Sequence, residues 1–234
     1  RYPARAPIKQ RARAPFPPML IVPATPRHLD TACALLADGR LVAIPTETVY
    51  GLAADACNGQ AVAKIFTAKG RPSFNPLIVH VASANDARQF VQMNETAQML
   101  AAQFWPGPLT MVLPQVQSNG ISELVSAGLP TLAIRVPAHK TARELLKSFG
   151  GAIAAPSANR SGSLSPTTPM HVAQSLGDAV DLILAAGACD VGLESTIIDV
   201  SGDVPVILRP GIITAEDLTN ALGLEKGHEI THAK

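Results

Sequence analysis

Two basic side chains in one short loop are the first residues of this 234-residue sequence whose types and spacing could do chemistry. Lys69 and Arg71 flank Gly70 and precede Pro72, at the end of a segment whose apolar spacing predicts a helix over 61–68. An arginine offers a planar fork of N–H donors and a lysine offers a compact charge, so the pair suits a polyphosphate. Cations in this position also simply complement the carbonyl dipole of a helix end, and that alternative stays open for the pair alone.

A second group of polar residues follows the apolar run Leu41–Ile44, which predicts a buried strand. Pro45 ends the strand because it has no backbone N–H for the ladder. The polar residues Thr46–Thr48 then stand at the carboxyl end of that strand, where open α/β sheets hold ligands. Gly51 eases the turn that leads toward the predicted helix.

Short polar side chains also stand at other predicted element ends. They include Ser157 and Asn159 after an apolar run, Ser195, and Arg209. A Ser-x-Asn pair is a weak signal by itself, because such pairs fill turns in many proteins. Taken together with the basic loop, these residues supply cations for phosphates and small polar groups for an amino acid.

Arg135 lies within the predicted strand Thr131–Val136, and strand alternation puts Thr131 on the same face. A charged residue in an apolar strand is almost never buried unpaired. Its partner is therefore a structural carboxylate, such as Glu47 or Glu194, or the carboxylate of a substrate. The residues alone do not choose between these partners.

Two histidine patterns call for different interpretations. His80 follows the apolar residues 77–79, where a histidine is more often a satisfied strand residue than a catalytic one. The segment His228–His232 matches the H-E-x-x-H zinc pattern, which needs a continuing helix and a third ligand. We interpret this match as a coincidence, and we expect no metal site built from protein ligands.

Composition limits the classes of function. Apolar residues make up 47% of the chain and charged residues 16%, so a sizeable core is expected. The net charge is +1, but the first 18 residues carry five cations and no carboxylate, which leaves the remainder net negative. That balance, together with only 4% aromatic residues, speaks against a general nucleic-acid binder. Three cysteines without a C-x-x-C pair and the lack of a membrane-length apolar run indicate a cytoplasmic protein.

The order of the patterns predicts one α/β domain over 19–222, preceded by a basic, proline-rich arm over 1–18 and followed by a tail over 223–234. Helices and strands interleave throughout, which predicts a twisted mixed sheet flanked by helices. Helices are expected over 27–38, 84–91, 95–104, 138–149, 168–176 and 214–222, strands over 109–113, 131–136, 152–155, 182–184, 196–200 and 204–208, and an irregular loop over 118–130.

Three motifs in this order resemble the YrdC/Sua5 family: PTETVYG at 45–51, KGRPSFNPLIVH at 69–80 and SAN at 157–159. The resemblance covers about Leu20 to Leu222. It implies a YrdC-like fold and a nucleotidyltransferase that condenses L-threonine, bicarbonate or CO2, and ATP into L-threonylcarbamoyl-AMP and pyrophosphate. The product of the family supplies the modification of the tRNA adenosine next to the anticodon, through a downstream threonylcarbamoyl transferase. The longer Sua5 form carries a second domain after a linker, and we do not expect that domain within these 234 residues.

The resemblance also implies roles for individual residues. The expected ATP contacts are Lys69, Arg71, Asn75, Thr131, Asn159, Thr167 and Arg209, with Ser165 as a nearby alternative to Thr167. The expected threonine contacts are Thr48, His80, Arg135, Ser157 and Ser195. Lys69 and Arg71 are expected to be catalytic, since neutralising charge matters more than a general base in such a reaction. Mg²⁺ would be held mainly by the triphosphate.

Two other functions are compatible with the same residues. The related domain of hydrogenase maturation proteins carbamoylates another acceptor, but those larger proteins carry zinc-finger C-x-x-C pairs and an acylphosphatase unit that this sequence lacks. A non-catalytic RNA-binding module would use the basic arm, and direct binding of tRNA is left open. The net negative charge of the chain after residue 18 and its few aromatic residues disfavour an RNA-binding function.

Overall fold

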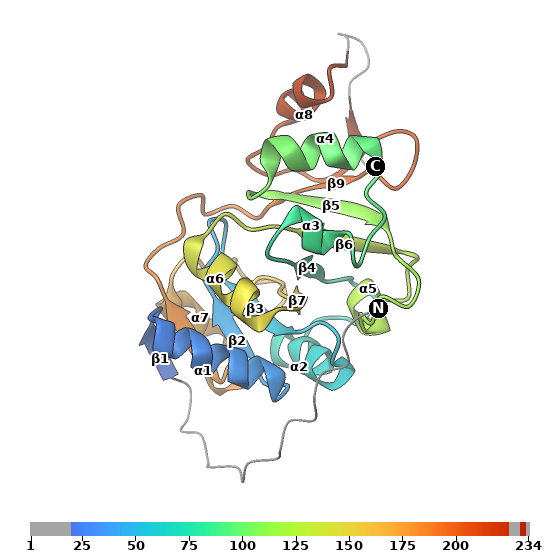
Figure 1. Cartoon of the computed structure of the whole chain (residues 1–234). Coiled ribbons are helices and arrows are strands. Elements are labelled where there is room, and N and C mark those ends of the chain that lie inside the picture. The colour runs from blue at the N-terminus through green and yellow to red at the C-terminus, as the bar shows by residue number, and fades with distance from the viewer. Residues whose placement is uncertain (1–19, 225–229, 233–234) are drawn as a thin grey trace.

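The computed structural model describes residues 20–224 and 230–232 (Figure 1). The expected arm over 1–18 lies outside the described residues, and so do residues 225–229 and 233–234 of the expected tail. His228 and Glu229 of the H-E-x-x-H pattern fall in that gap. The division of the chain into arm, domain and tail therefore stays a prediction.

One mixed sheet of 11 strands runs through the described residues, in the order β1-β8-β2-β3-β7-β4-β6-β5-β9-β10-β11. Its strands are β1 (Leu20–Pro23), β2 (Val42–Ile44), β3 (Gly51–Asp55), β4 (Ile78–His80), β5 (Leu109–Pro114), β6 (Thr131–Arg135), β7 (Ile153–Ala154), β8 (Leu182–Ala185), β9 (Thr196–Asp199), β10 (Val206–Arg209) and β11 (Thr231–His232). The sheet contains parallel neighbours such as β4 and β6 and antiparallel neighbours such as β5 and β6. This mixed sheet with flanking helices confirms the predicted fold class.

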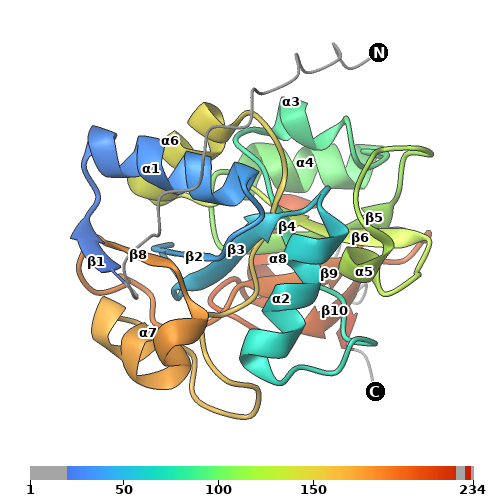
Figure 2. The same cartoon turned by 90° about the horizontal axis from the view of Figure 1, so that it is seen from below.

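Helices cover both faces of the sheet (Figures 1 and 2). They are α1 (Pro26–Ala37), α2 (Gly59–Lys69), α3 (Ala84–Ala87), α4 (Glu95–Phe104), α5 (Glu123–Ser126), α6 (Lys140–Phe149), α7 (Pro169–Leu176) and α8 (Ala215–Ala221). Figure 2 shows α1 and α6 on one side of β2 and β3, with α7 on the other side. Among residues 20–224 and 230–232, no helix has the length and apolar character needed to cross a membrane.

Side chains alternate between two cores across the central strands. Val42 and Ile44 of β2 pack with α1 and α6 in the smaller core, whereas Ala43 between them belongs to the larger core on the other face. All three residues are fully buried. The continuous apolar run of the sequence therefore reflects a strand that is covered on both faces.

The prediction for the segment after residue 50 was incomplete, because it contains a strand that the sequence analysis missed. The chain turns after β2 and returns as β3, which pairs antiparallel with β2 from Gly51 to Ala53 before α2 begins. The run of small apolar residues in β3 has no alternation of polar and apolar side chains, since both of its faces are buried. The motif PTETVYG is therefore the connection of a hairpin rather than a strand-to-helix turn.

Two shorter predictions also differ from the structure. The expected helix over 84–91 ends at Ala87, because Val91 forms a β-bridge with Gln115 and this pairing needs extended backbone. The expected irregular loop over 118–130 contains the single helical turn α5, in which the Ser122 hydroxyl accepts a hydrogen bond from the Leu124 N–H. A contact with a distant segment therefore decides the conformation after Ala87, whereas α5 is capped by its own neighbour in the sequence.

The basic loop begins where α2 ends. The Asn58 side chain accepts hydrogen bonds from two N–H groups of the first turn, each at 3.1 Å. Gly70 ends the helix in the left-handed conformation, with φ of 60°. The chain therefore leaves the helix sharply, and Lys69 and Arg71 point to different partners.

Strand β10 contains an irregularity that aims Arg209. Ile207 pairs with Ile198, but Arg209 pairs with Ile197, so Leu208 is an extra residue in the ladder. Such a bulge re-aims the side chains that follow it and is frequent next to functional sites. Leu208 is left exposed, and Arg209 turns back toward Ser195.

The turn after β10 passes so close to β9 that only glycine fits at 211. A Cβ added to Gly211 would lie 2.5 Å from the backbone nitrogen of Thr196 and 2.8 Å from the carbonyl oxygen of Glu194. The buried Thr196 hydroxyl ties the two segments together by donating to the Ile213 carbonyl at 2.8 Å.

Gly211→Ala is therefore expected to lower the free energy of unfolding by about 1–3 kcal/mol, the usual cost of overpacking a close contact. Denaturant titration of the purified variant measures this change. Gly202→Ala is the matched control, because nothing lies within 4 Å of a Cβ added there. Equal stabilities of the two variants would contradict the assigned contact.

Candidate functional site

Two adjoining cavities contain most of the residues predicted for the site. The first, of about 120 Å³, is lined by seven residues predicted from sequence: Thr48, Arg71, His80, Arg135, Ser157, Ser195 and Arg209. The second, of about 750 Å³, is lined by two further predicted residues, Ser165 and Thr167. Glu194 lies on the wall of both cavities.

The first cavity draws its walls from segments far apart in the sequence. β4 and β6 are parallel neighbours, so they end at the same edge, and their register pairs His80 with Arg135. The β2–β3 connection is held against the loop after β7 by hydrogen bonds from Ala158 N to Tyr50 O at 2.8 Å and from Leu52 N to Pro156 O at 2.7 Å. These backbone bonds place Thr48 and Ser157 on the same cavity.

Arg135 forms a buried ion pair with Glu47, in which its Nη2 lies 2.6 Å from Oε1. Its Nη1 donates to the Thr48 hydroxyl at 2.9 Å and its Nε to the Gly107 carbonyl at 3.0 Å. The sequence left open whether Arg135 pairs with a structural carboxylate or with a substrate. In the structure it pairs with the structural carboxylate of Glu47. Arg135 still lines the cavity, and these contacts use three of its five N–H groups.

The Glu47 carboxylate is only partly satisfied. Its Oε2 atom is buried and has no hydrogen-bond partner among the described residues. A buried carboxylate oxygen without a hydrogen bond destabilises the folded state. The ion pair with Arg135 is therefore what stabilises the Glu47 charge in the interior.

His80 is neutral and fully buried at the end of β4. Burial lowers the pKa of His80 to about 3, and the neighbouring Arg135 charge adds to the effect. Its Nδ1 lies 3.3 Å from the Ile78 carbonyl oxygen, which can only accept a hydrogen bond. The Nδ1 atom therefore carries the proton, and Nε2 is left as an acceptor for a donor in the cavity.

The two cations of the basic loop have separate roles. Arg71 lines the first cavity, and its Nη2 donates to the Pro76 carbonyl at 3.0 Å. Lys69 is buried, and its ammonium donates to the carbonyl oxygens of Ser157 and of Asn159, the second at 2.6 Å. Burial and the Arg71 charge lower the pKa of Lys69 to about 8. Lys69 thus holds the loop 157–159 in position.

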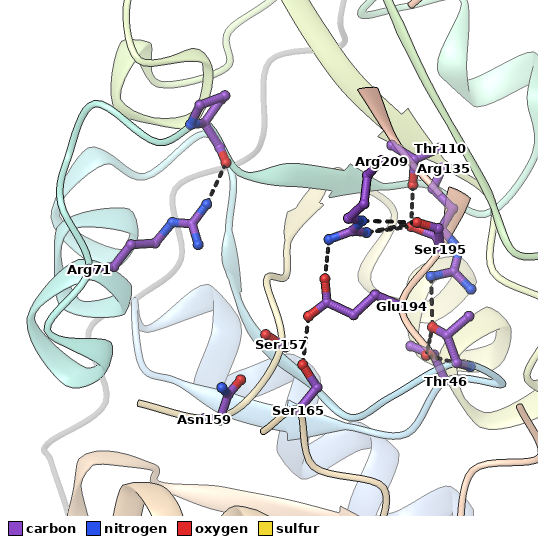
Figure 3. Close-up of polar contacts among 12 residues, drawn as sticks. Thr46, Arg71, Thr110, Arg135, Ser157, Asn159, Ser165, Glu194, Ser195 and Arg209 are labelled. Carbon is purple, nitrogen blue, oxygen red and sulfur yellow. Dashed lines mark hydrogen bonds and ion pairs between the residues drawn. The ribbon is translucent and has the colours of Figure 1, made fainter. Parts of the chain in front are cut away.

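Arg209 and Glu194 form an ion pair beside Ser195, shown in Figure 3. The Arg209 guanidinium also donates to the Ser195 hydroxyl at 3.0 Å, and that hydroxyl lies 2.7 Å from the hydroxyl of Thr110. Burial alone would raise the pKa of Glu194, but the Arg209 charge and a hydrogen bond from Ser165 outweigh it, and the pKa lies below its usual range.

Four of the predicted site residues lie outside the walls of these two cavities: Lys69, Asn75, Thr131 and Asn159. Asn75 accepts a bond from Arg71 Nε at its carbonyl, at 3.4 Å. The buried Asn159 amide donates to the carbonyls of Arg160 and Ser163 and orders the loop that leads to Ser165. Thr131 opens β6 on the same face as Arg135.

Sequence reasoning missed the part that Glu194 plays in this site. Glu194 was considered only as a partner of Arg135, and the structure pairs it with Arg209 instead. The sequence offered one sign of this role, because Glu194 directly precedes the predicted site residue Ser195 and follows Leu193. Thr46, which belongs to the polar group 46–48 noted in the sequence, lines the first cavity, and its hydroxyl donates to the Val49 carbonyl at 2.6 Å and so shapes the turn that presents Thr48.

The fold and the site define a class of protein: an α/β domain whose polar cavity offers arginines, serine and threonine hydroxyls and a neutral histidine to a small anionic ligand. A family model, for the Sua5/YciO/YrdC proteins and described as telomere recombination, matches residues 34–211. The chain belongs to this family, which confirms the resemblance seen in the sequence.

Curated relatives are similar over most of the chain. A threonylcarbamoyl-AMP synthase of Pyrococcus abyssi is 44% identical over 204 residues, which are 87% of this chain and 59% of that protein. One of Bacillus subtilis is 48% identical over 197 residues, 84% of this chain and 57% of that protein. This chain therefore spans less than two thirds of the length of these relatives.

A solved structure shows the same fold. The crystal structure of P. abyssi Sua5 complexed with L-threonine matches with a TM-score of 0.84 and 41% identity, over 92% of this chain and 62% of that chain.

The neutral state of His80 predicts a pH dependence of stability. Its pKa is lower in the folded than in the unfolded protein, so between about pH 6.5 and 3 the unfolded chain binds more protons. The neutral His80 therefore contributes to the free energy of unfolding above pH 6.5. This contribution is lost as the pH falls, with a slope approaching about 1.4 kcal/mol per pH unit.

Unfolding free energies measured from pH 7 to pH 4.5 should therefore fall less steeply in His80→Asn than in the original protein. His171→Asn, which changes an exposed histidine, is the control for loss of a histidine. Identical slopes for His80→Asn and the original protein would show that His80 is not buried in its neutral form.

Proposed function

We propose that this chain condenses L-threonine, CO2 or bicarbonate, and ATP into L-threonylcarbamoyl-AMP and pyrophosphate. The observation that carries the proposal is the pair of adjoining cavities, a small one with hydroxyls, a histidine and arginines, and a larger one beyond Glu194. The names of the curated relatives support this activity, and the threonine complex of the P. abyssi protein supports an amino-acid site.

Threonine is proposed to bind in the first cavity. The hydroxyls of Thr48, Ser157 and Ser195 and the free Nε2 of His80 would accept and donate hydrogen bonds to its amine and hydroxyl. The two remaining N–H groups of Arg135 would take its carboxylate. Valine would be rejected strongly, because its lack of a hydroxyl would leave buried polar groups unpaired.

ATP is proposed to span from the first cavity into the second. Arg71 and Arg209 would contact the phosphates, and Ser165 and Thr167 would lie beside the nucleoside portion. Lys69 would act through the loop 157–159, which it holds in place. Asn75, Asn159 and Thr131 remain proposed ATP contacts.

The chemistry needs charge neutralisation and alignment more than a dedicated base. The neutral amine of threonine and bicarbonate give a carbamate with release of water. A carbamate oxygen then attacks the α-phosphate, and the bond from that phosphorus to the bridging oxygen breaks, with the electron pair leaving on pyrophosphate. Arginines aimed at the phosphates stabilise the charge that develops on the leaving group.

Mg²⁺ would accompany the triphosphate. No group of three or more His, Cys, Asp or Glu side chains suited to a metal ion occurs among residues 20–224 and 230–232. Glu194 and Glu47 are both engaged with arginines. The ion would therefore take its ligands mostly from phosphate oxygens and water, and it would further neutralise the charge on the leaving group.

The product is an activated threonylcarbamoyl group. Its proposed use is the modification of the tRNA adenosine next to the anticodon, which requires a downstream threonylcarbamoyl transferase as a partner.

Pyrophosphate release by the purified chain tests the activity, with threonine, bicarbonate and ATP each omitted in turn. All three omissions should abolish release. Arg71→Ala should lower the rate by at least about tenfold, the scale of one lost charge-assisted contact. Arg88→Ala, on the exposed end of α3, is the matched control and should keep the original rate. Release without threonine would overturn the proposed function.

The role of Arg135 is tested by comparing two changes to its ion pair. Arg135→Lys should raise the threonine concentration needed for half-maximal rate by at least about tenfold and change that for ATP little, because an ammonium cannot form the bidentate fork. Glu47→Gln keeps the guanidinium and should retain threonine binding better. Melting curves show whether each variant is folded. An unchanged threonine requirement in folded Arg135→Lys would remove Arg135 from the site.

A further inference from the structure

The Glu194 carboxylate is surrounded by the kinds of donor and charge that usually surround a bound phosphate. One carboxylate oxygen accepts from the Arg209 guanidinium, and the other accepts from the Ser165 hydroxyl at 2.6 Å (Figure 3). The charges of Lys69 and Arg71 also act on this region. Cations and hydroxyl donors that converge on one anionic group are the usual surroundings of a phosphate oxygen in a protein.

Glu194 also lies where the two cavities meet, since its side chain lines both. The first cavity holds the arginines, and the second is bordered by the loop around Ser165 and Thr167. A ligand with a polyphosphate in one cavity and a larger group in the other must pass the Glu194 carboxylate. In its observed position this side chain therefore lies on the path of a ligand that spans both cavities.

The two ion pairs of the site differ in how easily they can open. Arg135 and Glu47 are almost fully buried, with side-chain exposures of 4% and 9%. Arg209 and Glu194 are each 32% exposed. An ion pair that water reaches is weak and readily exchanged, whereas a buried one is costly to break.

We propose that Glu194 is a positioning residue that occupies the place of a substrate phosphate and turns away from Arg209 and Ser165 when a phosphate binds. The identity of the ligand rests on the proposed function, but the exchange of one anion for another does not. The carboxylate keeps Arg209 aimed at the site beforehand. It then competes with pyrophosphate for the same donors and so promotes release of that product.

Pyrophosphate binding to the full chain, measured by titration calorimetry, tests this exchange. Glu194→Gln removes the competing charge and should bind pyrophosphate at least about tenfold more tightly than the original protein. Asp190→Asn is the matched control: it removes the same charge from an exposed position four residues earlier and should change the affinity little. Unchanged or weaker binding by Glu194→Gln, or an equal gain in both variants, would overturn the proposal.

A crystal structure of the original protein with pyrophosphate provides a second test, which does not depend on how well the variant folds. Glu194 should be turned away from Arg209, with a pyrophosphate oxygen in its place. A carboxylate still bonded to Arg209 beside bound pyrophosphate would refute the exchange. Neither measurement uses threonine or bicarbonate, so the proposed function can fail in the turnover assay while the anion exchange stands.

Discussion

The site depends on an imbalance of charge in a small, partly buried volume. Arg71, Arg135 and Arg209 line the first cavity, and Lys69 is buried close to Arg71. Two carboxylates form ion pairs there, Glu47 with Arg135 and Glu194 with Arg209. Like charges held close together in a medium of low polarisability repel strongly, and the lowered pKa of Lys69 reflects its burial and the nearby Arg71. The surplus of positive charge favours a ligand with several negative charges, which a triphosphate supplies.

Backbone hydrogen bonds between loops hold these charges in place against their repulsion. The β2–β3 connection is bonded to the loop after β7, to Pro166 through the Tyr50 N–H at 2.8 Å, and to Val191, whose N–H donates to the Glu47 carbonyl at 2.9 Å. The Lys69 ammonium adds bonds to the loop 157–159. Because the loops share these bonds, the backbone positions the side chains of the site together with the contacts that those side chains make to one another.

The two ion pairs of the site differ in burial and in the elements that they join. The buried pair of Arg135 and Glu47 joins the β2–β3 connection to β6, and breaking it would strand a charge in the interior. The pair of Arg209 and Glu194 is reached by water and sits on the bulged end of β10. In the proposed reaction, the buried pair would form a rigid wall for the amino acid, and the exposed pair would form an exchangeable wall for the phosphate that leaves as pyrophosphate.

Local chemistry in the sequence determined much of this protein. Apolar runs marked most strands, Gly70 marked the end of α2, and three motifs in order identified the family before any fold was known. These features are readable because each depends on a residue and its near neighbours. The hairpin strand β3 escaped detection, since a strand buried on both faces lacks the alternation that distinguishes it from a helix.

Only the tertiary structure decided the partners of the charges. Arg135 could have paired with Glu47, Glu194 or a substrate, and the fold places the β2–β3 connection next to the end of β6, where Arg135 reaches Glu47. Lys69 and Arg71 are two residues apart, yet one binds loop carbonyls and the other faces the cavity. The bulge in β10 placed Arg209 beside Glu194. Such pairings join residues up to 90 positions apart, and charge alone cannot specify which of several oxygens a cationic side chain reaches.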